Sequence, residues 1–493
     1  MPDRVTVAVA GASGFVGRAF CDAYRDRYQL VGLSRASAQP RPDSGPHQWR
    51  SCDLYSQLQI ERALEGVDVA IYLVHSMMPR DRLTQADFAD LDLILADNFA
   101  RAAARAGVRK IVYLGGIIPQ GVDELSRHLA SRLEVEQTLA AHGVPLTTLR
   151  AGLVVGAGGS SFRILLRLVE RLPAMLVPRW TRTPTQPIAL ADVLELLSQV
   201  VDRSEFDGGT WDVGGPDVVT YRQMIADVAE LTERRRVLLP APLFSPRLSR
   251  LWVSLVTGTP RALVGPLVES LRHPMVARDR DLQDAVGQPG IPWRTVLAQA
   301  LAERSTVSPL RTSADRLAIR RSRKVRSVQR LTRPPEASSM DIARAYLAWL
   351  PRFMWPWLRV DSDECSARFY LRLIPKPLLS MRLSSERSTE ARTLFYVDGG
   401  LLVAPTKPLG RLEFRISPVG DHVIAAVHQF EPRLPWYLYV FTQALVHLLV
   451  MWGFDRYLRR VSRGQEPALS SASQPRALAA PTPESAAGFE GRG

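Results

Sequence analysis

The chain has 493 residues, of which 46% are hydrophobic and 23% charged, and this length suffices for two or three globular domains. Its three cysteines, Cys21, Cys52 and Cys365, have the spacing of neither a metal site nor a disulfide framework, and no apolar signal segment precedes the first strand. The net charge of +14 is not accompanied by a nucleic-acid-binding motif. We therefore expect a cytoplasmic protein without a nucleic-acid partner.

The first 156 residues alternate between short apolar segments and amphipathic ones. The expected strands are residues 4–10, 28–35, 47–54, 68–76, 110–116 and 145–156; the expected helices are a segment ending near residue 27 and residues 58–66, 84–106 and 125–142. Strands that alternate with helices predict an α/β fold with a doubly wound parallel sheet and helices on both faces.

The pattern changes after residue 156. Helices and loops, with one further strand at 209–215, predict a small lobe on the substrate side that completes a first domain over residues 1–235. A helical extension (236–300), an Arg-rich linker (301–324), an α+β domain (325–461) and a disordered tail (462–493) are expected to follow.

The charge of the chain is concentrated around this linker. Residues 301–335 hold ten Lys or Arg and two acidic residues, more than half of the net charge. A solvated linker is the favoured interpretation, and contact with an anionic membrane surface is the second.

The first strand runs into "GASGFVG", residues 11–17, at the start of a helix. Gly11, Gly14 and Gly17 permit a tight turn whose N–H groups can approach a pyrophosphate, and the helix N-terminus favours negative charge. Because a βαβ unit continues beyond the turn, we interpret it as the phosphate loop of a dinucleotide-binding (Rossmann) domain. The whole turn is assigned to the cofactor, including Ala12, Ser13, Phe15 and Val16.

Residues at the ends of the next strands should border the same cofactor. Ser34 and Arg35 end the second strand without an acidic residue, and Arg35 can bind a 2′-phosphate, which favours NADP over NAD. Asp53 and Leu54 are expected beside the adenine. The segment Val74, His75 and Ser76 is expected beside the ribose and nicotinamide.

With these residues, the chain resembles the atypical short-chain dehydrogenases/reductases, and more closely the NmrA-like NAD(P)-binding proteins fused to a DUF2867 domain. The resemblance is carried by "GASGFVG", "YLVHSM", "GVRKIVYLGG", "LVERLPAMLVPRWTRTPTQPIALADV", "DVGGPDVVTYRQM" and "LWVSLVTGTP", and it covers roughly residues 4–280. It implies a helix-grip-like fold for the second domain, akin to folds that bind lipids and other hydrophobic ligands.

The resemblance also implies a Tyr-x-x-x-Lys motif with a nearby Ser. The matching positions here hold His128 and Arg132, and the Ser position falls near Gly115-Gly116. His128 can act as a base at neutral pH, and Arg132 can hold ribose hydroxyls or phosphate. The favoured alternative is that both residues only hold the cofactor or pack.

Two other segments have more than one interpretation. Arg179, Trp180 and Arg182 lie where related folds line the substrate side, and they either hold an anionic or aromatic group or form a packed surface loop. Residues 436–454 carry no charged side chain and can form a buried helix, an interfacial helix on the inner face of the membrane, or a membrane span.

The function expected from these observations is an NADP-dependent oxidoreductase that acts on a small apolar carbonyl or quinone-like substrate. The second domain would supply or sense the hydrophobic ligand. The alternative is a non-catalytic NADP-binding redox sensor, regulator or assembly factor, which the missing Tyr and Lys favour.

Overall fold

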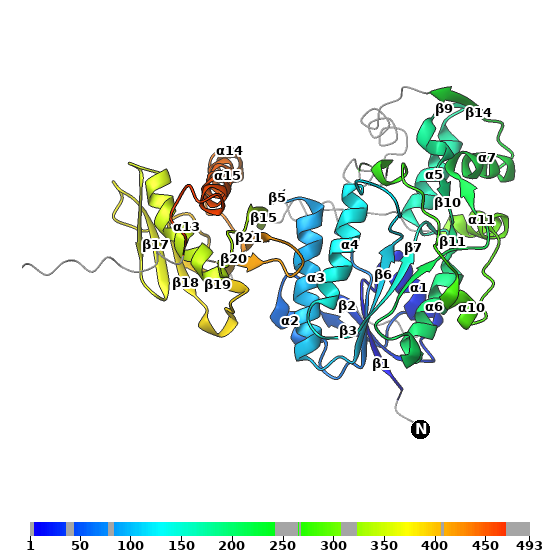
Figure 1. Ribbon diagram of the computed structural model, residues 1–493, viewed down its shortest axis with the longest axis horizontal. Coiled ribbons are helices and arrows are strands. Elements are labelled where there is room, and N and C mark those ends of the chain that lie inside the picture. Colours follow the sequence, from blue (N-terminus) through cyan, green and yellow to red (C-terminus); the bar gives the residue numbers. More distant parts are fainter. Residues whose placement is uncertain are drawn as a thin grey trace, which may run out of the picture. The chain divides into compact units, whose positions relative to one another are not determined.

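A computed structural model describes residues 4–35, 44–76, 83–241, 265, 268–306, 323–405 and 409–469. Contacts divide the chain into two compact units (Figure 1). The first comprises residues 1–328 with 418–420, and the second comprises residues 329–417 with 421–493.

The first unit is built on a seven-stranded sheet of order β12-β7-β6-β4-β1-β2-β3 in which neighbouring strands are parallel. Its strands are β1 (Thr6–Ala10), β2 (Gln29–Ser34), β3 (Gln48–Ser51), β4 (Val69–Tyr72), β6 (Lys110–Gly116), β7 (Leu146–Ala151) and β12 (Thr210–Val213). Continuous apolar runs form the central strands because both faces of the sheet are covered. The order of the strands reverses between β1 and β4, where ligands of such sheets bind.

Helices cover both faces of this sheet (Figure 1). On one face α2 (Gln57–Ala63), α3 (Phe88–Arg105) and α4 (Arg127–Ala140) contribute to or border one apolar core; on the other, α1 (Phe15–Ala23) and α6 (Leu190–Asp202) contribute to another. The predicted doubly wound α/β fold is therefore confirmed. The predicted helix 84–106 is shorter than expected, because Asp87 caps it at Ala89 and a short strand, β5 (Leu83–Gln85), precedes it.

A lobe follows the sixth strand of the chain's alternating series. Its elements are β8 (Val154–Val155), α5 (Ser160–Arg171), β9 (Ala174–Pro178), η1 (Arg179–Arg182), β10 (Pro184–Thr185), β11 (Ile188–Ala189), β13 (Val219–Thr220), α7 (Tyr221–Leu231), β14 (Val237–Ala241), α11 (Trp293–Ala302) and η3 (Glu303–Thr306). Two short helices, η2 (Ser204–Phe206) and α10 (Asp281–Ala285), instead contribute Phe206 and Leu282 to the core that packs on the sheet.

The predicted boundary at residue 235 does not separate two packed bodies. β14 pairs in parallel with β9, and α11 shares one apolar core with α5 and α7. The described part of the predicted helical extension therefore belongs to the lobe and begins with a strand. Most of the predicted Arg-rich linker, residues 307–322, lies outside the described residues.

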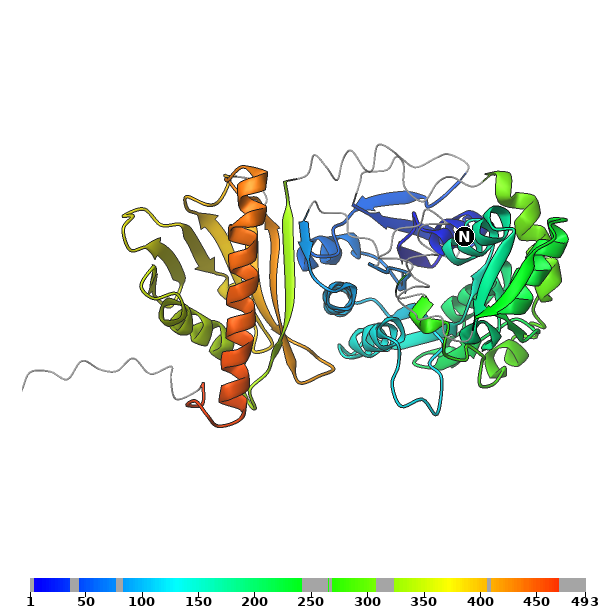
Figure 2. The same cartoon turned by 90° about the horizontal axis from the view of Figure 1, so that it is seen from above.

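The second unit has the α+β composition that the sequence predicts. After β15 (Val325–Thr332) and α13 (Ser339–Phe353), an antiparallel meander leads to a long C-terminal helix. The remaining elements are β16 (Leu358–Ser362), β17 (Ser366–Leu371), β18 (Leu379–Leu383), η4 (Ser385–Arg387), β19 (Arg392–Gly399), β20 (Gly410–Ile416), β21 (His422–Phe430), α14 (Trp436–Phe441) and α15 (Gln443–Ser462). Figure 2 shows α15 extended across this unit.

One face of the meander packs on α13 and α15 through aromatic side chains. Phe454 of α15 lies 5.2 Å from Tyr346 and 5.3 Å from Trp349, measured between ring centroids. Leu469 also packs into this core, so the chain is ordered beyond residue 462, where the tail was expected to begin; residues 470–493 lie outside the described part.

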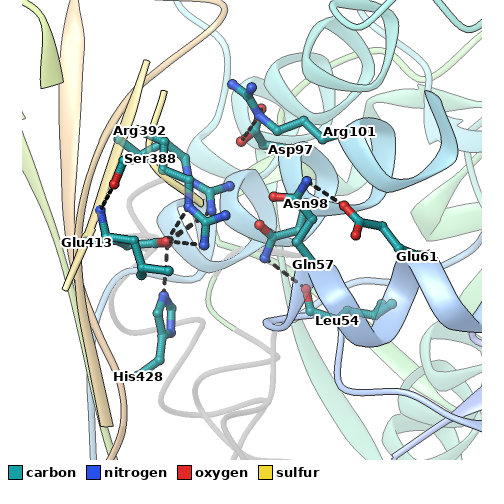
Figure 3. Close-up of polar contacts among 12 residues, drawn as sticks. Leu54, Gln57, Glu61, Asp97, Asn98, Arg101, Ser388, Arg392, Glu413 and His428 are labelled. Carbon is teal, nitrogen blue, oxygen red and sulfur yellow. Dashed lines mark hydrogen bonds and ion pairs between the residues drawn. The ribbon is translucent and has the colours of Figure 1, made fainter. Parts of the chain in front are cut away.

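The opposite face of the meander carries a buried cluster of charges (Figure 3). Glu413 of β20 forms ion pairs with Arg392 at 2.7 Å and Arg415 at 3.1 Å, and its Oε1 lies 3.2 Å from His428 Nε2. Burial alone would raise the pKa of Glu413, but Arg392, Arg415 and His428 hold that pKa well below its usual range. The carboxylate of Glu413 therefore stays ionised.

Candidate functional site

The glycine turn between β1 and α1 has the geometry of a phosphate loop. Gly11 has φ +96°, and a Cβ there would lie 3.1 Å from the carbonyl oxygen of Leu73. A Cβ on Gly17 would lie 2.3 Å from the carbonyl oxygen of Gly11. Gly14 is the N-cap residue of α1, and no side chain accepts a hydrogen bond from the first N–H groups of this helix among the described residues. This combination leaves the helix N-terminus open to an anion.

Phe15 has a different environment from the rest of the turn. Its ring packs against a second glycine-rich loop, where a Cβ on Gly156, Gly158 or Gly159 would lie 2.9, 2.8 or 3.3 Å from the ring. Phe15 therefore joins the glycine turn to the loop that precedes α5. The sequence "GAGG" at 156–159 was a signal for this contact that the spacing of the first motif did not reveal.

The residues expected beside the adenosine follow β2 and β3. Arg35 is exposed directly after β2, and Ser34 lies at the end of that strand. The Asp53 carboxylate accepts from the N–H of Tyr55 at 3.2 Å, and the carbonyl of Leu54 accepts from Asn98 Nδ2 at 3.0 Å (Figure 3). Asp53 and Leu54 thus form a fixed turn at the expected edge of the sheet.

The most specific geometry lies after β4, at the point where the strand order reverses. His75 Nδ1 lies 2.5 Å from Asp92 Oδ2 of α3, and the other oxygen of Asp92 accepts from the N–H of Ser76 at 2.7 Å. A carboxylate accepts hydrogen bonds, so this geometry places a proton on Nδ1 of His75. Val74 packs at the margin of the neighbouring core.

His75 Nε2 points away from this pair. It is buried and has no hydrogen-bond partner among the described residues. A buried polar atom without a partner costs free energy, so a ligand atom that bonds to it would be stabilised.

The structure brings His128 beside His75, although they lie far apart in the sequence. The two ring centroids are 5.1 Å apart, and the rings are tilted by 44°. Burial, with His75 and Arg132 nearby, lowers the pKa of His128 well below its ordinary value. His128 is therefore neutral at physiological pH, and its buried Nδ1 also finds no partner in the part of the chain that the structure describes.

Arg132 is held by main-chain and aromatic contacts. Its Nη2 donates to the carbonyl of Leu114 at 2.8 Å, and its guanidinium carbon lies 5.1 Å from the centroid of the Tyr113 ring. Its Cγ is 3.8 Å from the position of a Cβ on Gly116, which places it beside the end of β6 as the family resemblance implies. Nη1 is buried without a partner among the described residues. The arginine has a fixed position and one unused donor group.

The loop expected on the substrate side forms η1. Arg179 and Arg182 are not buried among the core residues, whereas Trp180 packs edge-on against Tyr221 at 6.4 Å between centroids and contacts Val268. Trp180 therefore has a packing role.

Asp92 was missed in the sequence. It lies inside "LDLILADNFA", an otherwise apolar stretch of α3, and it is 1% exposed. The signal available in the sequence was the presence of acidic residues within an apolar helix. A buried carboxylate needs a hydrogen-bonding partner, so such residues indicate a polar contact inside the fold. Among the described residues, no group of three His, Cys, Asp or Glu side chains could hold a metal ion.

The fold is that of a doubly wound nucleotide-binding domain, and buried polar side chains gather at its switch point. Comparison with known proteins agrees: residues 7–180 match the model of the NAD dependent epimerase/dehydratase family. Residues 7–180 of the first unit are therefore similar to the NAD(P)-binding domains of that family.

Two proteins of known name are similar to parts of the chain. The auxiliary protein GraX of Staphylococcus aureus is 29% identical over 142 residues, which are 29% of this chain and 42% of GraX. Sanguinarine reductase of Eschscholzia californica is 25% identical over 252 residues, covering 43% of this chain and 89% of the reductase. A solved nucleoside-diphosphate-sugar epimerase from Staphylococcus aureus covers 60% of this chain at 14% identity, with a TM-score of 0.49.

Proposed function

We propose that the protein is an NADP-dependent oxidoreductase that reduces an apolar carbonyl or quinone-like substrate, with His75 as its acid–base residue. The observation that carries this proposal is the buried, unpartnered Nε2 of His75, held by Asp92 at the switch point of the sheet in the described part of the chain. An enzyme of this class needs a proton donor beside the carbonyl oxygen, and the short-chain dehydrogenase Tyr is replaced here by His128.

The cofactor assignment depends on three features of the first unit. The open N-terminus of α1 and the close approach of Gly11 and Gly17 suit a diphosphate. Arg35, exposed after β2, suits a 2′-phosphate and makes NADP the proposed form. The unused donor of Arg132 suits a ribose or carboxamide oxygen. When bound, the reduced nicotinamide supplies the hydride.

His75 completes the reduction in this proposal. With hydride delivered to the carbonyl carbon, His75 Nε2–H would donate a proton to the carbonyl oxygen, and the product would be an alcohol. A quinone reduced in this way would become the hydroquinone once the hydrogen on that carbon left as a proton and the second oxygen gained one. Asp92 fixes the ring through Nδ1 and stabilises the imidazolium form from which the proton leaves. The pKa of His128 is too low for it to donate a proton at neutral pH, so we assign it to packing against His75 and to accepting or donating one hydrogen bond in the crevice.

The preference for an apolar substrate has indirect support. The ring of Phe88 meets His75 edge-on, with centroids 6.2 Å apart. The similarity to sanguinarine reductase covers most of that reductase and favours a reductive reaction. We further propose that residues 325–461 form a DUF2867-like, helix-grip-like domain that supplies or senses a hydrophobic ligand, which the order of strand, helix, meander and helix supports.

A non-catalytic NADP-binding sensor or regulator is the second candidate. Arg132 Nη2 donates to the main-chain carbonyl of Leu114. This bond favours the non-catalytic candidate, because the guanidinium is then not directed at a proton donor on α4 whose pKa it would lower. The similarity to an auxiliary protein, GraX, also agrees with this candidate.

One pair of variants separates the two candidates. His75→Gln removes the proposed proton donor. The control, His142→Gln, removes a histidine that contacts Asp97 at 2.7 Å, and Asp97 lies on α3, the helix that carries Asp92. The purified proteins would be tested for NADPH binding by calorimetry and for NADPH oxidation with a panel of quinones and aromatic carbonyls.

We expect wild type and His142→Gln to oxidise NADPH and His75→Gln to bind it without turnover. If the panel gives no turnover with wild type while NADPH binds, the regulator is correct. If His75→Gln keeps full activity, the assigned role of His75 is wrong.

A further inference from the structure

The second unit has an exposed apolar helix face that its own fold leaves uncovered. Large apolar side chains that are 43–74% exposed follow one another along α14 and α15. They are Tyr437, Leu438, Phe441, Leu445, Val446, Leu449 and Trp452, and we call this surface the α14–α15 face. Leu445, Leu449 and Trp452 have the spacing of a single helical stripe.

The other side of α15 is part of the core. Phe454 and Leu458 are fully buried among the aromatic side chains of α13 and β20. The segment Trp436–Ser462 is long and apolar enough to span a membrane by length and composition, but spanning would withdraw these side chains from their core. One face of α15 is therefore packed in the core of the second unit, and its opposite face is available to a partner.

Positive charge marks the C-terminal end of this face. The guanidinium of Arg456 lies 4.7 Å from the centroid of the Trp452 ring. Arg459 and Arg460 follow with exposed side chains, each beside one acidic residue, and Arg463 is exposed one turn later. Arg456 and Arg463 form no ion pair within the described residues. An arginine stacked on an exposed tryptophan is an arrangement suited to the boundary between lipid chains and headgroups.

A second exposed group of aromatic residues lies on the same unit. Trp355 and Trp357 are 63% and 61% exposed, and the guanidinium of Arg372 lies 3.9 Å from the centroid of the Trp355 ring. Phe353 connects this group to α15, because its ring is 2.8 Å from the position of a Cβ on Gly453. In both groups an arginine stacks on an exposed tryptophan, Arg456 on Trp452 and Arg372 on Trp355.

We propose that the α14–α15 face binds the surface of an anionic phospholipid bilayer, with the helix lying in the interface. The apolar stripe would enter the acyl-chain boundary, and Arg456, Arg459 and Arg463 would contact lipid phosphates. The charge favours this occupant over a neutral apolar partner. The proposal does not depend on the activity of the first unit.

The test uses the full chain and sedimentation with phosphatidylcholine vesicles, with or without phosphatidylglycerol. The variant Leu445→Gln/Leu449→Gln alters two stripe residues that are 54% and 51% exposed. The matched control, Val237→Gln/Leu239→Gln, alters two residues of β14 that are 56% and 48% exposed. Sedimentation velocity without vesicles would report the oligomeric state of each protein.

We expect wild type and the β14 control to bind vesicles that contain phosphatidylglycerol, with weaker binding in high salt. The stripe variant should bind about tenfold or more weakly. Arg456→Gln/Arg463→Gln should weaken binding to anionic vesicles severalfold and abolish most of its salt dependence.

Three results would overturn the proposal. They are no binding of wild type to anionic vesicles, equal binding by the stripe variant, and a wild-type dimer that the stripe variant dissociates while neither protein binds vesicles. The last result would assign the face to a second copy of the chain.

Discussion

His75 and Asp92 form a close pair, 2.5 Å between Nδ1 and Oδ2, that joins the loop after β4 to a buried position in α3. A second pair of the same kind joins His142, which follows α4, to Asp97 of α3 at 2.7 Å. Asp97 also binds Arg101, whereas the described part of the chain offers the far nitrogen of His75 no partner. The two pairs therefore provide an internal comparison between a candidate reactive histidine and a structural one.

Replacing Asp92 by asparagine should affect turnover more than cofactor binding. The neutral amide would favour a different His75 tautomer and stabilise its imidazolium less, so kcat/KM should fall about 10²–10⁴-fold. NADPH affinity, measured by calorimetry, should change little. The matched control, Asp97→Asn, should keep its activity; an equal loss in that variant would show that the effect is general to α3.

The low pKa of His128 predicts a pH dependence of stability. The unfolded chain binds a proton at this histidine near pH 6.5, but the folded chain does not until much lower pH. Unfolding is therefore favoured progressively as the pH falls below about 6.5, by about 1.4 kcal/mol per pH unit for one such group.

His128→Phe removes this contribution. The decrease in thermal midpoint between about pH 7.5 and pH 5 should be smaller in the variant than in wild type. Identical pH profiles for the two proteins would contradict the neutral, buried state of His128.

Gly17→Ala should damage the phosphate loop. The new Cβ would lie 2.3 Å from a main-chain oxygen that cannot rotate away, so the loop must shift at a cost of about 1–3 kcal/mol. NADPH binding should become undetectable by calorimetry. Gly399→Ala, where a Cβ meets no atom within 4 Å, should leave both stability and binding unchanged.

Arg35→Ala should change the preference between the two nicotinamide nucleotides. Loss of charge-assisted bonds to a 2′-phosphate should weaken NADPH binding by about 10–100-fold and NADH binding little. Arg62→Ala, which removes another exposed arginine, is the control. Equal losses for both nucleotides would refute the 2′-phosphate role.

Glu413→Gln should destabilise the second unit strongly. Arg392, Arg415 and His428 would then surround a neutral group, and loss of one member of a buried ion pair costs about 3–5 kcal/mol. The exposed Asp398 lies 4.0 Å from Arg382, and Asp398→Asn should cost less than about 1 kcal/mol. Denaturant unfolding of both variants would measure the difference.

The sequence predicted those features that depend on local pattern. Strand β6 occupies residues 110–116, as predicted, because a short apolar run bounded by polar residues and glycines is typical of a buried strand. The glycine turn was predicted for the same reason, since its position between strand and helix is a local property.

The candidate site was only partly predictable. His75 and His128 were each identified, one from its place after a strand and the other from its helix. Their contact, and the bond from Asp92, depend on how α3 and α4 pack against the sheet. Spacing along the chain does not determine which side chains of two different helices meet, so the pairing of these residues became visible only in three dimensions.

The contact between Phe15 and the loop at 156–159 limits which sequences this protein can accept. A methyl group at Gly158 would press on Phe15, the first residue of α1, so a mutation far away in the chain would disturb the helix N-terminus that we propose binds a diphosphate. Variation in the lobe and variation in the glycine turn are consequently not independent. Homologues that lose the bulky ring at position 15 should be the ones free to carry larger residues at positions 156, 158 and 159.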